Sequence, residues 1–285
     1  MARMSDHRIG LIMIAVSTLA WSTAGLFTRA ITEDLMTVIV WRGAFGCAGL
    51  LAVLLYLQGP AGLRGFTRLR RAGWVYAALS GVGMLCYITS LRMTSIAHVA
   101  VIYAVVPFLT AGLAWAILHE RPSRDSVIAS VAAFVGAVIM VGLSSDGSLL
   151  GDTLALVMTL GMALMVVIAR KHPEIPTLPA GIMSAAISVV LCLPFGVNLS
   201  PDTDQIWLMA GFGLVNSTIG FSLFLLGSTM IKPIQTALIG ALEAPIAPLW
   251  VWMMFGETPG PATLVGATVI LTAVIWHITR QYRDR

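Results

Sequence analysis

Long runs of apolar residues, separated by short polar breaks, make up most of the 285-residue chain. Ten runs can be distinguished, each close to the ~20 apolar residues that a membrane-spanning helix needs. They cover residues 9–28, 35–57, 73–91, 98–118, 126–143, 151–169, 178–197, 206–227, 234–255 and 261–278. Backbone amides must be paired inside lipid, and the runs lack the short alternating strands of a membrane barrel. We therefore expect an all-α membrane protein with ten spanning helices.

The composition excludes most water-soluble classes of protein. Hydrophobic residues make up 58% of the chain and charged residues 11%, whereas a soluble domain carries about 25% charged residues. Ten helices would use roughly 200 residues and leave no room for a soluble domain. A soluble enzyme, a disordered chain and a nucleic-acid binder are therefore excluded. The first run is about twice as long as the hydrophobic core of a signal peptide, so we expect a retained helix.

The distribution of Lys and Arg predicts the orientation in the membrane. With the N-terminus in the cytoplasm, fourteen of the 17 basic residues fall in cytoplasmic segments, and only Arg29 and Arg92 fall in outer loops. The remaining one, Arg42, lies inside the second run. Cytoplasmic segments of membrane proteins are enriched in Lys and Arg. We therefore expect both termini in the cytoplasm.

The two halves of the chain share a sequence pattern. The segment Trp115-x4-Glu120-x-Pro122 recurs as Trp252-x4-Glu257-x-Pro259 after 137 residues, and Gly10 and Arg29 match Gly151 and Arg170 after 141. The pattern predicts two five-helix repeats, residues 1–145 and 146–285. An odd number of spans per repeat gives the two copies opposite orientations, as in many secondary transporters.

These features resemble the drug/metabolite transporter superfamily in its EamA-domain branch, and YddG-type amino-acid and metabolite exporters in particular. The resemblance rests on Pro107, on the two Glu-x-Pro segments and on Leu242-Glu243-Ala244-Pro245. It implies an exporter of the cell inner membrane with a central cavity that opens alternately to each side. It also implies that the first, third, fourth, sixth, eighth and ninth helices line this cavity, with the fifth and tenth peripheral.

Two charged residues inside the apolar runs are the first candidates for substrate binding. Glu243 lies near the middle of the ninth run, and Arg42 lies somewhat outside the middle of the second. A charge inside a bilayer costs roughly 3 kcal/mol on insertion scales and usually faces protein or water. Glu243 is a candidate for binding a substrate ammonium group or a proton, and Arg42 for holding a carboxylate. The alternative is that each pairs structurally between helices.

Polar and aromatic residues that share helix faces complete the candidate binding set. They are Trp21, Ser22, Tyr87, Tyr103, Asn216 and Phe221. Aromatic rings offer apolar walls with polar edges, and an amide in lipid needs several partners. Ordinary helix packing is the alternative for each. Five other tryptophans lie towards helix ends and are expected to anchor the protein at the membrane interface: Trp74, Trp207, Trp250, Trp252 and Trp276.

Three prolines inside predicted helices indicate where the protein bends. Pro107 lies in the fourth run, and Pro245 and Pro248 lie in the ninth. Each removes a helix hydrogen bond and permits a kink. We hypothesise that the two helix hairpins joined by the turns at 92–97 and 228–233 are the outer and inner gates, and that the prolines let one close while the other opens.

The sequence therefore predicts a secondary transporter that exports amino acids or similar small metabolites by alternating access. Its expected partners are a small-molecule substrate and the lipid bilayer, with no cofactor, metal or nucleic acid. Downhill facilitation and proton coupling through Glu243 both remain open. Export of drugs, nucleobases or other metabolites is the alternative within the superfamily.

Two alternatives come from other classes of protein. An intramembrane enzyme is disfavoured because no catalytic motif is found. A non-transporting assembly subunit would use the line of Gly43, Gly46 and Gly49 for close association with a partner helix, although such lines also pack helices within one chain.

Overall fold

The computed structural model describes residues 2–94, 96–141, 148–256 and 260–283, which form helices and connecting loops without a strand. The predicted all-α class is confirmed. The helices are α1 (Ala2–Ser22), α2 (Ala24–Ala30), α3 (Leu35–Gln58), α4 (Arg64–Thr67), α5 (Arg71–Met93), α6 (Ile96–Tyr103), α7 (Val106–Leu118), α8 (Arg124–Val141), α9 (Leu149–Lys171), α10 (Thr177–Cys192), α11 (Thr203–Phe212), α12 (Ser222–Met230), α13 (Pro233–Gly240), α14 (Glu243–Phe255) and α15 (Pro261–Arg283), with a 3₁₀ turn η1 (Gly59–Leu63) and a π-helical segment η2 (Gly213–Phe221).

The lengths of these helices make the chain a multi-pass membrane protein. Within the described residues, eight helical segments are long and apolar enough to cross a membrane. The two other predicted runs fall on α8 and on α10, whose apolar part, Leu178–Cys192, is shorter. Ten crossings therefore remain a prediction. The proposed repeat boundary at 145/146 and the residues Glu257 and Pro259 lie outside the described part of the chain.

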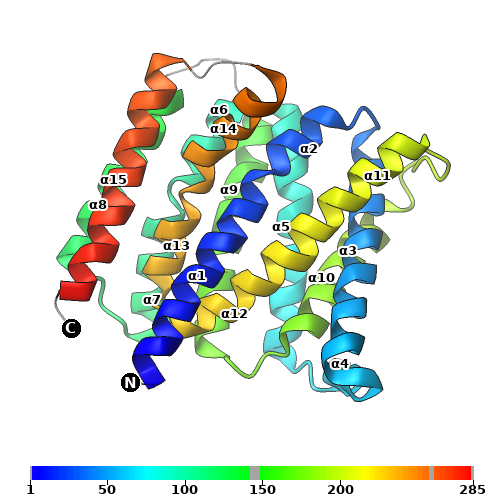
Figure 1. The fold of residues 1–285 in the computed structure, drawn as a ribbon, viewed down its shortest axis with the longest axis horizontal. Coiled ribbons are helices and arrows are strands. Elements are labelled where there is room, and N and C mark those ends of the chain that lie inside the picture. Colours follow the sequence, from blue (N-terminus) through cyan, green and yellow to red (C-terminus); the bar gives the residue numbers. More distant parts are fainter. Residues whose placement is uncertain (1, 95, 142–147, 257–259, 284–285) are drawn as a thin grey trace.

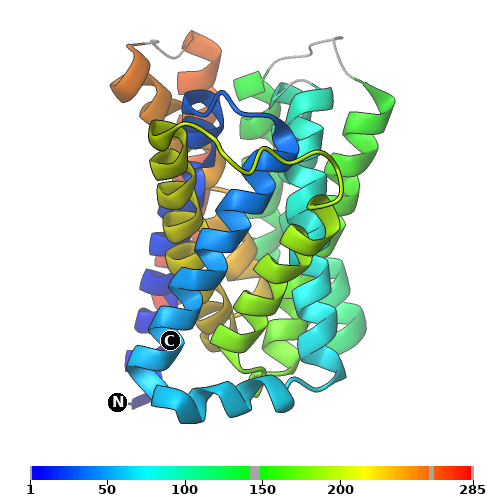
Figure 2. The same cartoon turned by 90° about the vertical axis from the view of Figure 1, so that its right-hand side faces the viewer.

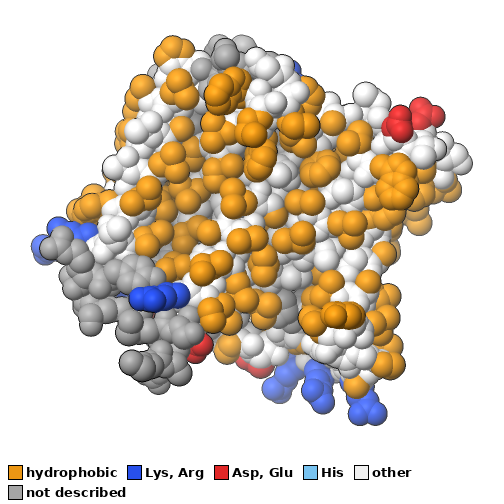
Figure 3. Space-filling model, viewed as in Figure 1, with side chains coloured by type: hydrophobic (Ala, Val, Ile, Leu, Met, Phe, Trp, Pro, Cys, Tyr) orange, Lys and Arg blue, Asp and Glu red, His pale blue; other side chains and the backbone are white. Residues whose placement is uncertain are grey.

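The long helices run side by side between two ends of a bundle (Figures 1 and 2). The N-terminus, the C-terminal end of α15 and α4 lie at one end, which we call the terminal end. The helix α2 and the start of α11 lie at the opposite end, which we call the distal end. Figure 3 shows hydrophobic side chains over most of the visible face, with Lys and Arg mainly towards the terminal end. A large apolar face of this kind is typical of a surface covered by lipid.

Small residues allow α3 to pack closely against two other helices of the same chain. A Cβ atom at Gly43 would lie 2.6 Å from a Val189 methyl group on α10, and one at Gly46 would lie 2.6 Å from Cβ of Ser217 on η2. Gly49 faces Thr218 in the same way. The predicted glycine line is therefore occupied by contacts within the chain.

Three of the long helices are interrupted, the fourth and ninth near their middles and the first in its last third. The first breaks at Thr23, between α1 and α2, the fourth between α6 and α7, and the ninth between α13 and α14. Pro107 and Pro245 follow the last two breaks, because a proline ring clashes with the carbonyl four residues earlier. At the first break, the hydroxyls of Ser22 and Thr23 donate to the carbonyls of Leu19 and Ala20. Such hydrogen bonds compete with the helix and bend it.

Candidate substrate-binding cavity

A cavity of about 770 Å³ lies between the interrupted helices and extends to the distal end of the bundle. Exposed Arg29 on α2 and Arg92 at the end of α5 lie among the residues at its mouth. Ligand pockets in proteins commonly have volumes of roughly 300–1,000 Å³. The cavity is therefore large enough for an amino acid or a considerably larger metabolite.

The helices that line the cavity differ in part from those that the resemblance implied. The first, third, fourth, sixth, eighth and ninth helices contribute, and α3 and α10, the second and seventh, contribute as well. Among the described residues, α8 contributes none and α15 only Thr263. Ala185 and Ser188 on α10 are small, which lets the cavity reach between α10 and α3.

All eight candidate binding residues line this one cavity: Trp21, Ser22, Arg42, Tyr87, Tyr103, Asn216, Phe221 and Glu243. Several lie next to a helix interruption, where backbone groups are released from the regular hydrogen-bond pattern. Ser22 ends α1, Tyr103 ends α6, and Glu243 begins α14. Discontinuous helices of this kind build the binding sites of many transporters. The role of these residues in binding remains a prediction.

The carboxyl group of Glu243 is the acidic centre of the cavity. It starts α14, where the positive end of the helix dipole favours a negative charge. Its side chain forms a hydrogen bond with Tyr87, and it interacts electrostatically with the Tyr103 hydroxyl. Glu243 and both tyrosines are partly exposed, so two phenol rings stand beside a carboxyl group that a ligand in the cavity can reach.

Arg42 is the basic centre, and it lies on α3. Its side chain is buried, and its guanidinium carbon lies 4.9 Å from the centre of the Phe212 ring. Arg42 interacts electrostatically with Tyr87, which also interacts with Glu243. The cavity therefore carries charges of both signs, and Tyr87 interacts electrostatically with each.

Trp21 and Asn216 each form hydrogen bonds to the helix on which the other lies. The Trp21 indole donates to the backbone carbonyl of Asn216 at 3.1 Å, and the Asn216 amide donates to the Ala20 carbonyl and the Thr23 hydroxyl, each at 3.2 Å. These bonds fix η2 against the break in the first helix. The Asn216 amide therefore donates its hydrogen bonds within the protein, and the Trp21 ring forms a wall of the cavity.

Ser22 connects the first helix to the ninth. Its hydroxyl donates to the Leu19 carbonyl at 2.7 Å and accepts from the indole of Trp250 at 2.8 Å. The prediction that Trp250 anchors the protein at the membrane interface is therefore wrong. Its ring points inward to satisfy its N–H on α1, whereas Trp74, Trp207 and Trp252 are exposed.

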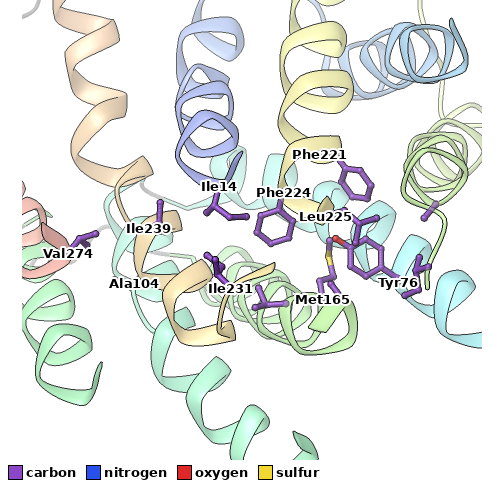
Figure 4. Close-up of a cluster of buried hydrophobic side chains, with 14 of the residues drawn as sticks. Ile14, Tyr76, Ala104, Met165, Phe221, Phe224, Leu225, Ile231, Ile239 and Val274 are labelled. Atoms are coloured by element: carbon purple, nitrogen blue, oxygen red, sulfur yellow. The ribbon is translucent and has the colours of Figure 1, made fainter. Parts of the chain in front are cut away.

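A cluster of buried side chains lies between the cavity and the terminal end. Figure 4 shows Ile14, Phe224, Leu225 and Tyr76 gathered between their helices, with Phe221 beside them. The Phe221 and Tyr76 rings meet edge to face, with centroids 5.7 Å apart. The cavity is thus open towards the distal end and separated from the terminal end by close packing.

The predicted gating prolines lie in different relations to the cavity. Pro248 lines it, whereas Pro107 and Pro245 lie just after the helix breaks and do not line it. Of the two predicted gate segments, the turn at 228–233 is fully described, but Ser95 of the turn at 92–97 lies outside the described residues. The gating role of the prolines remains a prediction.

Four methionines that are not in the candidate binding set form a wall of the cavity. Met158, Met162 and Met165 on α9 and Met84 on α5 line the cavity. The spacing of i, i+4 and i+7 on α9 places three of them on one helix face, and this spacing is visible in the sequence. Methionine side chains are flexible and polarizable, and they suit surfaces that accept ligands of different shape.

Helices that span a membrane around a central cavity with an opening at one end define this protein as a membrane transporter. Comparison with known families gives the same class. The EamA-like transporter family matches residues 8–142 and 149–279. The chain belongs to this family, as the resemblance predicted, and it is a transporter, not an enzyme.

Individual relatives agree with this class. The chain is 25% identical over 274 residues to an uncharacterized transporter of Archaeoglobus fulgidus, covering 94% of this chain and 96% of that protein. It is also 25% identical over 199 residues to a protein of Rickettsia bellii named as an S-adenosylmethionine uptake transporter, covering 69% of this chain and 68% of that protein. A crystal structure with 18% sequence identity has the same fold, with a TM-score of 0.78 over 96% of this chain and 98% of that one.

Proposed function

We propose that the chain is a secondary transporter that exports amino acids or similar small metabolites by alternating access. The observation that carries the proposal is the placement of Glu243 at a helix break inside the cavity, beside Tyr87 and Tyr103. A carboxylate flanked by phenol rings can bind an ammonium group by charge and through the faces of the rings. Ionisable residues inside membrane proteins commonly mark the substrate pathway.

The named relatives support an amino-acid-like substrate. S-adenosylmethionine, which the name of the Rickettsia bellii protein gives as its substrate, is itself an amino-acid derivative. That name describes uptake, whereas the proposal for this chain is export.

The positions of the helix breaks support two inverted repeats, residues 1–145 and 146–285. The breaks at 104–105 and 241–242 are separated by the same 137 residues as the Trp-x4-Glu-x-Pro segments. A Cβ atom at Gly10 would meet Met230 and Ile231, and one at Gly151 would meet the equivalent positions Met93 and Thr94. Equivalent contacts therefore occur at opposite ends of the bundle, as alternating access between inverted halves requires. Pro107 and Pro245 are the proposed hinges.

The charge distribution supports an inner-membrane location with the terminal end in the cytoplasm. Both chain ends and α4 share this end, where the basic side chains gather (Figures 1 and 3). Basic residues are retained on the cytoplasmic side during insertion. In this orientation, the cavity faces the outside of the cell.

One observation favours a second candidate, the export of larger amphipathic compounds such as drugs or nucleobases. The methionine wall and the rings of Trp21 and Phe221 give the cavity an adaptable apolar side. Flexible methionine-rich surfaces are used by binders that accept several ligands. Both candidates are therefore included in the transport assay.

The proposal is tested by counterflow into vesicles that contain the purified protein. Vesicles preloaded with unlabelled amino acids should take up labelled amino acid saturably and without chemical change. Glu243→Gln should lower this flux about tenfold or more, because a hydrogen bond to a charged group contributes about 1.5–3 kcal/mol. Glu174→Gln, on an exposed loop carboxylate paired with His172, is the matched control and should leave the flux unchanged.

Three further readings complete the assay. Counterflow of a nucleobase or an amphipathic drug, but not of amino acids or S-adenosylmethionine, would establish the second candidate. A pH-sensitive dye inside the vesicles distinguishes proton coupling, which acidifies or alkalinises the lumen, from facilitation, which does not. Equal amino-acid flux through Glu243→Gln and the parent protein would remove Glu243 from the mechanism.

A further inference from the structure

Arg42 combines burial, access to the cavity and the lack of an ion-pair partner among the described residues. Its side chain is only 4% exposed, yet it lines the cavity. Its Nε atom has no hydrogen-bond partner, and none of the described residues forms an ion pair with its guanidinium group. Buried charges in proteins are normally paired, because an isolated charge in an apolar medium is strongly disfavoured.

The contacts of Arg42 within the protein do not pair its buried charge with an opposite charge. The Phe212 ring beneath the guanidinium group provides a cation–π contact, which is worth about 0.5–2 kcal/mol. Among the described residues, Arg42 and Glu243 do not form an ion pair, although Tyr87 interacts electrostatically with both. Both groups line the same cavity, so a ligand in it can reach the two opposite charges.

We infer that Arg42 binds the carboxylate of a zwitterionic substrate, whose ammonium group lies towards Glu243. The inference deepens the proposed function and rests on it for the identity of the substrate. The planar guanidinium fork matches a carboxylate in a bidentate arrangement, and its single positive charge balances one carboxylate but not the charge of about −1.5 to −2 on a phosphate group. The Phe212 ring lies against the guanidinium group, and the Nε atom has no hydrogen-bond partner within the protein.

A substrate-independent experiment tests whether Arg42 makes this region attract anions. Ala185 lines the cavity on α10, and its carbonyl lies 3.2 Å from where a Cβ of Gly43 would be, next to Arg42. Ala185→Cys is introduced after the native cysteines Cys47, Cys86 and Cys192 have been replaced by alanine. The rates of reaction with a negatively charged and a positively charged methanethiosulfonate reagent are then compared. The rate with the negative reagent divided by the rate with the positive reagent should fall about tenfold in Arg42→Gln. An unchanged ratio would contradict the inference.

A ligand series tests whether the bound group is a carboxylate. The probes are L-phenylalanine, 2-phenylethylamine, which lacks the carboxylate, and 3-phenylpropionate, which lacks the amine. Their dissociation constants are measured from thermal shifts of the purified parent protein, Arg42→Gln and Arg42→Lys. The two carboxylate probes should bind about tenfold or more weakly to Arg42→Gln, whereas the amine should change less than about twofold. Arg42→Lys should be intermediate, because it keeps the charge but not the fork.

The melting temperature in the absence of ligand distinguishes a binding role of Arg42 from a structural role. Removing an unpaired buried charge should leave the melting temperature of Arg42→Gln equal to or above that of the parent protein, as is common for binding residues. A strong drop in melting temperature, or equal loss of amine and carboxylate binding, would assign Arg42 to the structure instead. If none of the probes changes the melting temperature of the parent protein, the ratio of the two methanethiosulfonate reaction rates tests the inference.

The outcomes distinguish the inference from the proposed function. Amino-acid counterflow that is unchanged in Arg42→Gln would contradict the role of Arg42 in carboxylate binding and leave the transporter proposal intact. A fall in the reagent ratio with binding of 3-phenylpropionate, but no amino-acid counterflow, supports the anion site and overturns the proposed substrate.

Discussion

Asp34 shows how one side chain can fix a helix end and a distant loop together. Its carboxylate accepts hydrogen bonds from the backbone N–H groups of Met36 and Thr37 at 2.9 and 3.0 Å, and so caps α3. It also accepts from the Thr37 hydroxyl, which in turn accepts from the backbone N–H of Asn198 at 2.8 Å. The start of α3 and the loop after α10 are thus joined at the distal end. This positions the two helices that extend the cavity around Arg42.

Replacing Asp34 by alanine should lower stability by about 1 kcal/mol, which is typical for loss of an N-cap, or roughly 2 °C in melting temperature. Burial raises the pKa of Asp34, but hydrogen bonds from Thr37 and Met36 outweigh it, so the pKa lies below the usual value. The carboxylate therefore stabilises the fold above the unfolded pKa of about 3.9, and this contribution is lost as pH falls through the lower folded pKa.

Melting curves of the purified protein between pH 7 and the lowest pH it tolerates measure this effect. The difference between the parent protein and Asp34→Ala should be full at neutral pH and shrink in acid. Asp202→Ala is the control, because Asp202 precedes α11 without a side-chain capping bond. Equal effects of the two substitutions would show that the Asp34 cap contributes nothing.

At the same scale, the sequence could identify residue types but not their partners. Charges within apolar runs are rare, which is why Arg42 and Glu243 could be singled out without coordinates. Asn216 fits the same reasoning, yet its amide donates to Ala20, 196 positions earlier, and such a pairing depends on how two helices pack. The inward position of Trp250 has the same origin, because its partner Ser22 lies 228 positions away.

Among the elements, α3 depends most on close approach, because glycines bring it against α10 and η2 within the same chain. Gly46→Ala should destabilise the protein by about 1–3 kcal/mol, the range typical of overpacking. The new Cβ would lie 2.6 Å from Cβ of Ser217, and a Cβ atom cannot move without its helix. Gly112→Ala on α7 is the matched control, since nothing lies within 4 Å of a Cβ there. It should be neutral or stabilising by up to about 1 kcal/mol.

Thermal melting and amino-acid counterflow of both variants measure this prediction. A lower melting temperature for Gly46→Ala than for Gly112→Ala is the expected order. The reverse order would mean that α3 and η2 can separate freely, which would also weaken the description of the cavity wall that they form.

Helix breaks show which elements can be predicted from sequence. Pro107 and Pro245 predict bends in the fourth and ninth helices, and both helices break there, because a proline interferes with the carbonyl four residues earlier. The break at Thr23 and the π-helical segment η2 carry no such signal. Ser and Thr bend a helix only when their hydroxyls bond backward, and most do not interrupt it.

The whole molecule adds a property that the sequence does not determine, namely the end at which the cavity opens. The apolar runs and the distribution of Lys and Arg predict helices and orientation, since these depend on local composition. If the two halves are inverted repeats, as proposed, they can close at either end with the same residues, so the choice is a balance between two packings. Here the buried cluster around Ile14 and Phe224 closes the terminal end.

Arg170 lies across this closed end and ties three helices together. Its Nε lies 3.6 Å from the Glu120 carboxylate that follows α7, and its NH1 donates to the Thr229 carbonyl of α12 at 3.0 Å. Arg29, which matches Arg170 in the proposed repeat, lies at the open mouth, over the Phe255 ring. The paired arginines thus occupy a closed and an open end of the same molecule, as expected if the Arg170 contacts hold the terminal end shut.

Arg170→Gln should therefore shift the protein towards opening at the terminal end. Both side chains of the ion pair are about one-third exposed, and such pairs contribute up to about 1 kcal/mol, so the shift should be roughly fivefold. The readout is the rate at which a maleimide labels Ile231→Cys, a position only 1% exposed in the closed cluster. Arg124→Gln, on an exposed arginine at the start of α8, is the control and should leave the rate unchanged. Labelling that rises equally in both variants would reflect general loosening, and labelling that rises in neither would show that apolar packing alone holds the terminal end closed.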